Sequence, residues 1–152
     1  MLKPNRFFNP ADSEVSYFMN ETGEAGSPVA YPTGDVMPPG LDDAEGIAVI
    51  PTATNQHLIG ILCTNVVESN DPLSGRRQHL NEVWVGDKVE IVRAGWFVTN
   101  RLEDGITPSP GDNLYFNADG LFTDQSGSAK VGKFESAVDE DGYARILLRI
   151  SN

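Results

Sequence analysis

A pattern that occurs twice in the second half of the chain is the strongest constraint on its fold. The two copies span residues 86–97 and 111–122, and each begins with Gly-Asp. Each copy reads as a turn, a strand of alternating polarity, a tight turn that ends in glycine and a second strand, which is the order expected of a β-hairpin. In the second copy, Ala118-Asp119-Gly120 favours a type I turn followed by a glycine bulge, because glycine adopts positive φ without cost.

Strand periodicity assigns the two faces of these hairpins. Because successive side chains of a strand alternate, Val89 and Ile91 share one face, as do Leu114 and Phe116. The side chains expected on the opposite face are polar in both copies: Lys88, Glu90, Asn113 and Tyr115. The repeat therefore predicts a core-forming scaffold before it suggests a catalytic centre.

Further strands are expected on both sides of the repeat. Residues 46–50 and 57–62 are short apolar runs bounded by turn residues, as expected of buried strands. Residues 130–138 and 143–150 form a third predicted hairpin, whose turn at 139–142 again ends in glycine. Short strands at this spacing predict an all-β fold, a small antiparallel β-barrel or sandwich built of hairpins, rather than a βαβ fold.

The N-terminal region has a different composition. Seven of the ten prolines lie within the first 51 residues, and proline fixes φ and removes a backbone donor, which favours extended chain. The region is nevertheless too rich in aromatic and aliphatic residues to remain in water. We therefore expect residues 1–45 to be an extended arm that runs along a surface, either its own β-barrel domain at 46–152 or a neighbouring subunit.

The net charge of -11 restricts the classes of partner. An acidic surface repels nucleic acid and anionic membranes, so neither is expected as a partner. The chain has no apolar run approaching the roughly 18 residues of a membrane span, and its N-terminus lacks a signal-peptide core. The single cysteine, Cys63, lies in an apolar run and is expected to be a buried, inert thiol. We therefore expect the protein to be made and kept in a cytosol unless it leaves in an assembly.

Metal and cofactor chemistry is not indicated. His57 and His79 have no recognisable metal-ligand spacing with Cys63, and His57 and Cys63 would lie about 20 Å apart on one strand. The acidic clusters at 42–46 and 139–142 lack the ligand spacing of an EF-hand loop. We therefore predict no metal, no cofactor and no enzymatic activity.

A carbohydrate-binding module, or a small carbohydrate-active protein, remains an alternative. Carboxylate pairs can come from distant strands, and four aromatic residues can be considered for a sugar platform: Trp84, Trp96, Tyr115 and Tyr143. Trp96 follows a predicted hairpin turn, where packing in a core or an interface is commoner.

The order of elements resembles the head decoration, or structural cement, proteins of tailed bacteriophages. The resemblance covers about residues 83–150 and rests on the two Gly-Asp strands, on Val131-Gly132-Lys133-Phe134-Glu135-Ser136-Ala137 and on Ala144-Arg145-Ile146-Leu147-Leu148-Arg149-Ile150. The proline-rich arm is not part of the pattern. The resemblance implies a small β-barrel without enzymatic activity, made in the bacterial host cytoplasm, that joins the capsid exterior of the virion and clamps adjacent major capsid proteins.

Contact residues follow from the composition of the arm and of the loop before the repeat. An apolar, proline-rich segment can add extended backbone to a foreign sheet edge, and paired arginines can meet acidic surfaces of a neighbouring subunit. The residues expected to contact the capsid or another copy are Phe7, Phe8, Tyr17, Phe18, Tyr31, Arg76 and Arg77. Homo-oligomers are expected, with trimers ahead of dimers. A different head-tail or tail component is the other alternative.

Overall fold

The computed structural model describes residues 2–3, 14–33, 46–68 and 82–150. The secondary-structure elements in these residues are all β-strands. The all-β prediction is therefore confirmed. The strands, in chain order, are β1 (Leu2–Lys3), β2 (Glu14–Met19), β3 (Pro28–Ala30), β4 (Ile47–Ala48), β5 (Leu58–Leu62), β6 (Asn65–Val67), β7 (Glu82–Trp84), β8 (Lys88–Val92), β9 (Ala94–Thr99), β10 (Asn113–Phe116), β11 (Phe122–Thr123), β12 (Gly132–Phe134) and β13 (Ala144–Arg149).

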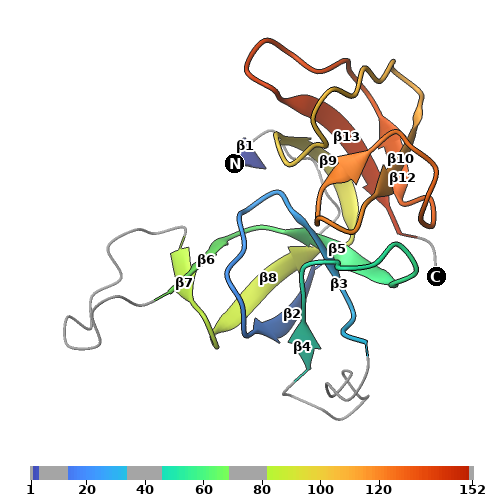
Figure 1. Cartoon of the computed structure of the whole chain (residues 1–152). Coiled ribbons are helices and arrows are strands. Elements are labelled where there is room, and N and C mark those ends of the chain that lie inside the picture. Colours follow the sequence, from blue (N-terminus) through green and yellow to red (C-terminus); the bar gives the residue numbers. More distant parts are fainter. Residues whose placement is uncertain (1, 4–13, 34–45, 69–81, 151–152) are drawn as a thin grey trace.

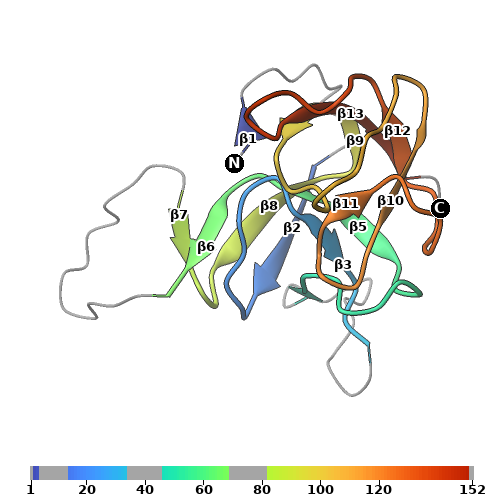
Figure 2. The same ribbon diagram turned by 45° about the horizontal axis from the view of Figure 1, so that its top comes forward.

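These strands form two main sheets, which Figures 1 and 2 show packed against each other. A six-stranded sheet has the order β1-β9-β13-β12-β10-β11, and a five-stranded sheet has the order β3-β5-β8-β2-β4. The short strands β6 and β7 pair in parallel at one side of the molecule. Most pairings within the two sheets are antiparallel, the exception being β2 with β4.

Both main sheets curl until their ends approach each other. In the six-stranded sheet, the segment after β9 reaches β11, where Phe122 donates to the carbonyl of Arg101 at 2.9 Å and Glu103 donates to that of Phe122 at 2.8 Å. In the five-stranded sheet, Ala30 of β3 and Val49, which follows β4, exchange hydrogen bonds of 2.8 and 3.1 Å. One sheet is thus a nearly closed barrel and the other a half-barrel, which agrees with the predicted barrel or sandwich.

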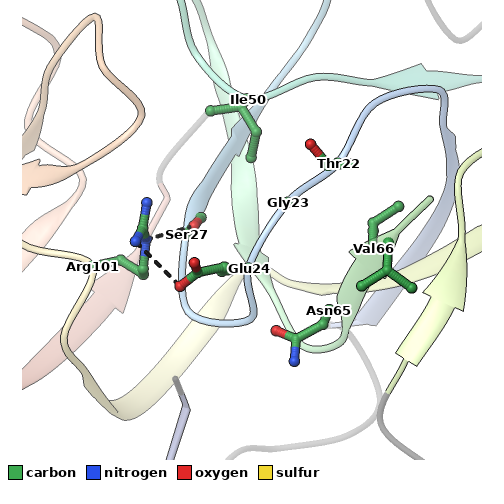
Figure 3. A pocket seen from close by; sticks show the side chains of 9 residues that line it. Thr22, Gly23, Glu24, Ser27, Ile50, Asn65, Val66 and Arg101 are labelled. Carbon is green, nitrogen blue, oxygen red and sulfur yellow. Dashed lines mark hydrogen bonds and ion pairs between the residues drawn. The ribbon is translucent and has the colours of Figure 1, made fainter. Parts of the chain in front are cut away.

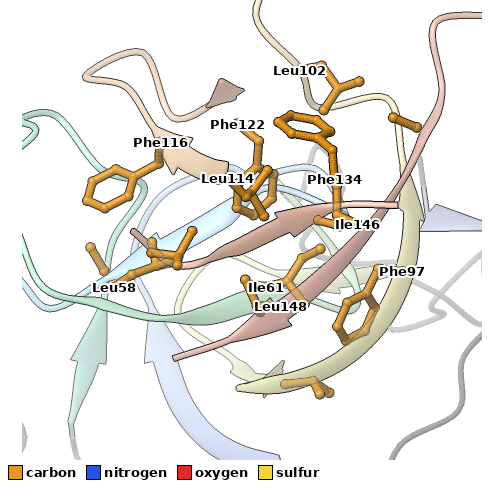
Figure 4. Close-up of a cluster of buried hydrophobic side chains, with 14 residues drawn as sticks. Leu58, Ile61, Phe97, Leu102, Leu114, Phe116, Phe122, Phe134, Ile146 and Leu148 are labelled. Atoms are coloured by element: carbon orange, nitrogen blue, oxygen red, sulfur yellow. The ribbon is translucent and has the colours of Figure 1, made fainter. Parts of the chain in front are cut away.

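Two clusters of buried side chains fill the molecule. The larger cluster, shown in Figure 4, joins the sheets, because Leu58, Ile61 and Val92 of the five-stranded sheet pack with Phe97 and Ile146 of the other. The smaller cluster lies between the five-stranded sheet and β6 and contains Met19, Val29, Ala48, Ile59, Leu62, Val66, Val89 and Ile91. Strand β5 contributes to both clusters, which explains why all five of its residues are buried.

The second copy of the repeat is a hairpin, as predicted. Strands β10 and β11 pair in antiparallel register, with Phe116 opposite Phe122. Asn117 opens the turn: its Oδ1 accepts the backbone N–H groups of Asp119 and Leu121, both at 3.0 Å, and Gly120 has a φ of +70°. The predicted type I turn with a glycine bulge matches this geometry.

The third predicted hairpin has the same turn. Strands β12 and β13 pair in antiparallel register. Oδ1 of Asp139 accepts the N–H groups of Asp141 and Tyr143 at 3.0 and 2.7 Å, and Gly142 has a φ of +80°. The acidic cluster at 139–142 therefore has a structural use as a turn.

The first copy of the repeat is not a hairpin, so that prediction was wrong. Strand β8 pairs with β2 and β5 in one sheet, and β9 pairs with β13 and β1 in the other. Only Arg93 separates the two strands. The position equivalent to Asn117 is Val92, whose side chain cannot accept a hydrogen bond and is fully buried in the larger cluster. The chain therefore crosses from one sheet to the other instead of turning back.

Part of the expected arm belongs to the five-stranded sheet. Strand β2 pairs with β8 and β4, and β3 pairs with β5. Met19, Val29 and Ala30 have 0% exposure, so the apolar residues of this region fill the protein's own core. The other parts of the expected arm, residues 4–13 and 34–45, lie outside the described residues.

Candidate functional site

A pocket of about 530 Å³ lies where the loop between β2 and β3 meets β6 and the segment after β9 (Figure 3). Its lining residues are Thr22, Gly23, Glu24, Ser27, Ile50, Asn65, Val66, Val67 and Arg101. The pocket contains a cation, a carboxylate and an amide, so it is the first place to look for chemistry.

The polar side chains of this pocket hold the loop in place. Arg101 donates from Nε to the hydroxyl of Ser27 at 3.2 Å and forms an ion pair of 3.2 Å with Glu24, as the dashed lines in Figure 3 show. Oδ1 of Asn65 accepts the N–H of Ala25 at 2.8 Å. These groups connect the loop to β6 and to the segment after β9, so their role is to hold the loop in position.

A buried hydroxyl completes this junction. Thr99 at the end of β9 is fully buried and donates from Oγ1 to the carbonyl of Gly26 at 3.1 Å. Gly26 has a φ of +96°, and an added Cβ would lie 2.5 Å from this same Oγ1. The junction is therefore closely fitted, and its hydrogen-bonding groups join the two sheets to each other.

A second candidate surface lies on the outer face of the six-stranded sheet. Lys133 of β12, Leu147 of β13 and Trp96 of β9 are neighbours in register, so their side chains form one row on that face. Trp96 is 44% exposed and is the one large hydrophobic side chain of the described residues that is exposed to this degree. Arg145 and Arg149 flank Leu147 along β13 and are also exposed.

A depression of about 620 Å³ adjoins this row. It is lined by Lys130, Gly132, Lys133, Glu135, Leu147 and Arg149. We call the combined surface the cationic face and define it as Trp96, Lys130, Lys133, Arg145, Leu147 and Arg149. It holds four of the chain's eleven basic residues. None of these four cations takes part in the ion pair between Arg101 and Glu24.

A third depression, of about 530 Å³, runs along the seam between the two sheets. Tyr31, His57 and Leu58 line it from the side of the five-stranded sheet, and Ala129, Lys130, Val131 and Ile150 line it from the other side. Because Lys130 also lines the depression on the outer face, the seam adjoins the cationic face.

Two of the predicted contact residues pack against each other. The rings of Tyr17 and Tyr31 meet edge to face, with centroids 6.2 Å apart, and both pack on the smaller core cluster. Burial, together with a hydrogen bond to Tyr31, raises the pKa of Tyr17 to about 12, so this phenol is protonated at any physiological pH. The two tyrosines therefore have an intramolecular use.

Phe18 lies beside a cation of its own sheet. It stands opposite Lys88 in the β2–β8 pair, and Nζ of Lys88 is 5.3 Å from its ring centroid, within the range of a cation–π contact. Its side chain is half-buried. The other predicted contact residues, Phe7, Phe8, Arg76 and Arg77, lie outside the described residues.

In the described part of the chain, no group of three or more His, Cys, Asp or Glu side chains is arranged to hold a metal ion. Cys63 is partly buried, and its Sγ lies 3.9 Å from the carbonyl oxygen of Ile61. Within these same residues, no helix has the length and hydropathy needed to cross a membrane.

Comparison with protein-family models finds no match to this chain, and comparison with curated proteins finds none either. Functional inference therefore depends on the residues and their geometry.

The cationic face was not predicted from the sequence. Its residues come from β9, β12 and β13, which become neighbours only through the strand order of the sheet. The signal available in the sequence was the alternation Arg145, Leu147, Arg149, which places two cations on one side of a strand. Trp96, for which core or interface packing was favoured, is exposed in the described structure.

Proposed function

We propose that this protein is a structural component of a virion, a non-enzymatic capsid decoration protein that binds the outside of a tailed-phage head and stabilises contacts between major capsid proteins. The observation that carries the proposal is the junction between the two sheets. There Arg101, Asn65 and Thr99 direct their hydrogen bonds to the chain's own loop. Side chains used in this way make a rigid scaffold, which suits a protein that reinforces a shell.

The segment that resembles decoration proteins supports the same proposal. Its two Gly-Asp turns each lead into a strand with an alternating buried face. Its Val-Gly segment forms β12, and its last apolar segment forms β13, which lies between β12 and β9 in the sheet. These elements supply the compact β-scaffold that the resemblance implies.

In this proposal, attachment to the shell depends on many weak contacts made by many copies. A contact made by a few side chains is weak for one copy, but many copies on a symmetric shell bind their sites together and gain from multivalency. Four of the seven predicted contacts are Phe7 and Phe8 in one part of the sequence and Arg76 and Arg77 in another. A net charge of -11 keeps free copies soluble before they bind.

The experiment mixes the full-length protein with phage heads purified without it and measures co-sedimentation. The full chain is required, because deleting the whole of residues 1–45 removes strands β2 and β3 from the five-stranded sheet. We expect saturable binding, and we expect the double variant Phe7→Ala/Phe8→Ala to bind at least about tenfold more weakly because it removes two aromatic anchors.

The matched control is Glu140→Ala, an exposed side chain in the turn between β12 and β13, which should bind like the wild type. Both variants must keep the wild-type unfolding midpoint for the comparison to be made. Absence of saturable binding by the wild-type protein would overturn the proposal.

A further inference from the structure

We propose that the cationic face binds an acidic polysaccharide, with the indole of Trp96 stacking on a sugar ring and the surrounding cations pairing with its acidic groups. This proposal is independent of the capsid proposal, because none of the residues that define the face is one of the predicted capsid contacts.

The register of the sheet places the indole among cations. Neighbouring strands lie about 4.8 Å apart, so the row from Trp96 through Leu147 to Lys133 spans about 10 Å. Arg145 and Arg149 are each two residues from Leu147, about 7 Å along the strand in opposite directions. A linear chain lying over the indole therefore meets a cation on either side.

The groups on this face match the chemistry of an acidic sugar. An exposed indole offers a flat apolar surface for the C–H face of a sugar ring, and arginine pairs with carboxylate or sulfate groups through two parallel hydrogen bonds. Next to Lys133 in register is Asn113, whose amide nitrogen donates to the Tyr115 hydroxyl at 3.4 Å. Both side chains are on the same strand face and can exchange hydrogen bonds with sugar hydroxyls.

Charge density favours a polysaccharide over a nucleic acid. The net charge of -11 opposes any anionic ligand, and most strongly one as densely charged as double-stranded DNA, which carries one charge per roughly 1.7 Å. The face carries four cations, and the acidic side chain of Glu135 lies among them. This arrangement suits a chain whose acidic groups are more widely spaced.

The shape of the face favours a polysaccharide over a protein partner. Protein–protein hot spots are anchored by aromatic side chains that fill pockets and become fully desolvated. Here the aromatic side chain projects from a sheet surface, and its neighbour in the row, Leu147, is already half-buried. The apolar area offered is that of one ring, which is the size of a sugar stacking site.

The experiment measures binding of the full-length protein to polygalacturonate by affinity electrophoresis, with neutral dextran and a single-stranded DNA oligonucleotide as the other probes. We expect retardation by polygalacturonate, weakened by added salt because the pairing is electrostatic, and none by dextran. Trp96→Ala and the double variant Arg145→Ala/Arg149→Ala should each weaken binding by about tenfold or more, while Trp96→Phe should retain most of it.

The matched control is Lys88→Ala, which removes an exposed cation from the other sheet and should leave binding within about twofold of wild type. No capsid is involved, so this test can fail while the capsid proposal stands, and the reverse also holds. Three results would overturn the inference: no retardation by polygalacturonate, tighter binding of the oligonucleotide, or equal binding by the wild type and Trp96→Ala.

Discussion

The two copies of the Gly-Asp pattern share their first half and differ in their second. Gly86 and Gly111 have φ values of +93° and +99°. In each copy the following aspartate donates its N–H to the carbonyl three residues earlier, at 2.9 and 3.0 Å, and its carboxylate accepts the N–H of that same residue, at 3.4 and 2.7 Å. Strands β8 and β10 then bury the same alternate positions.

After these strands the copies separate, and one position explains why. Asn117 accepts two backbone N–H groups and closes a hairpin within one sheet. Val92, its equivalent, is buried at the contact between the sheets, and the chain continues into the other sheet. This repeat therefore encodes a turn and a strand. The residue that follows the strand determines whether the chain turns back within one sheet or crosses to the other.

The largest expected effect comes from placing the turn-forming residue at the crossing. Val92→Asn adds an amide to a fully buried site and should lower the free energy of unfolding by about 3–5 kcal/mol, measured by urea denaturation. It should not create a hairpin, because only Arg93 separates β8 from β9. Val92→Ala, which adds no polar group, should cost less. A cost for Val92→Asn under about 1 kcal/mol would contradict the role given to this residue.

A smaller effect is expected at the glycine that completes the hairpin turn. An alanine Cβ at Gly120 would overlap the Cγ2 methyl of Ile50, whereas at Gly142, in the corresponding turn of the third hairpin, nothing lies within 4 Å. Both glycines have positive φ. Gly142→Ala should therefore cost about 1–2 kcal/mol, and Gly120→Ala about 2–4 kcal/mol. Equal shifts in the thermal unfolding midpoint would show that the contact with Ile50 is not the source of the difference.

The smallest effect is expected from removing the turn-forming side chains. Asn117→Val and Asp139→Val each lose two hydrogen bonds to backbone N–H groups and should destabilise the protein by about 1–2 kcal/mol. Asp139→Asn keeps the accepting oxygen and should stay within about 0.5 kcal/mol of wild type. If Asp139→Asn and Asp139→Val unfold at the same denaturant concentration, these hydrogen bonds do not stabilise the turns.

Much of the fold could be predicted because its signals are local. A short apolar run bounded by turn residues predicted β5, and alternating apolar residues predicted β10 and β13. Strand β3 was assigned to the arm because the whole region is rich in proline, although a proline such as Pro28 is tolerated at the first residue of an edge strand. The crossing after β8 could not be predicted, because it depends on which side chains the opposite sheet presents to Val92.

The candidate surface was harder to predict than the fold. The sequence singled out aromatic residues of the N-terminal region, of which Tyr17 and Tyr31 pack on the protein's own core. The cationic face combines strands that begin at residues 94, 132 and 144, and only the sheet order brings them together. Surfaces assembled from distant strands leave no contiguous motif in a sequence.

The most direct test of the central claim, that this protein reinforces a phage shell, is the temperature at which heads release their packaged DNA, measured with and without saturating full-length protein. Reinforcement predicts that heads carrying bound protein release DNA at a higher temperature than heads without it. Release at the same temperature, with binding confirmed by co-sedimentation, would contradict the claim.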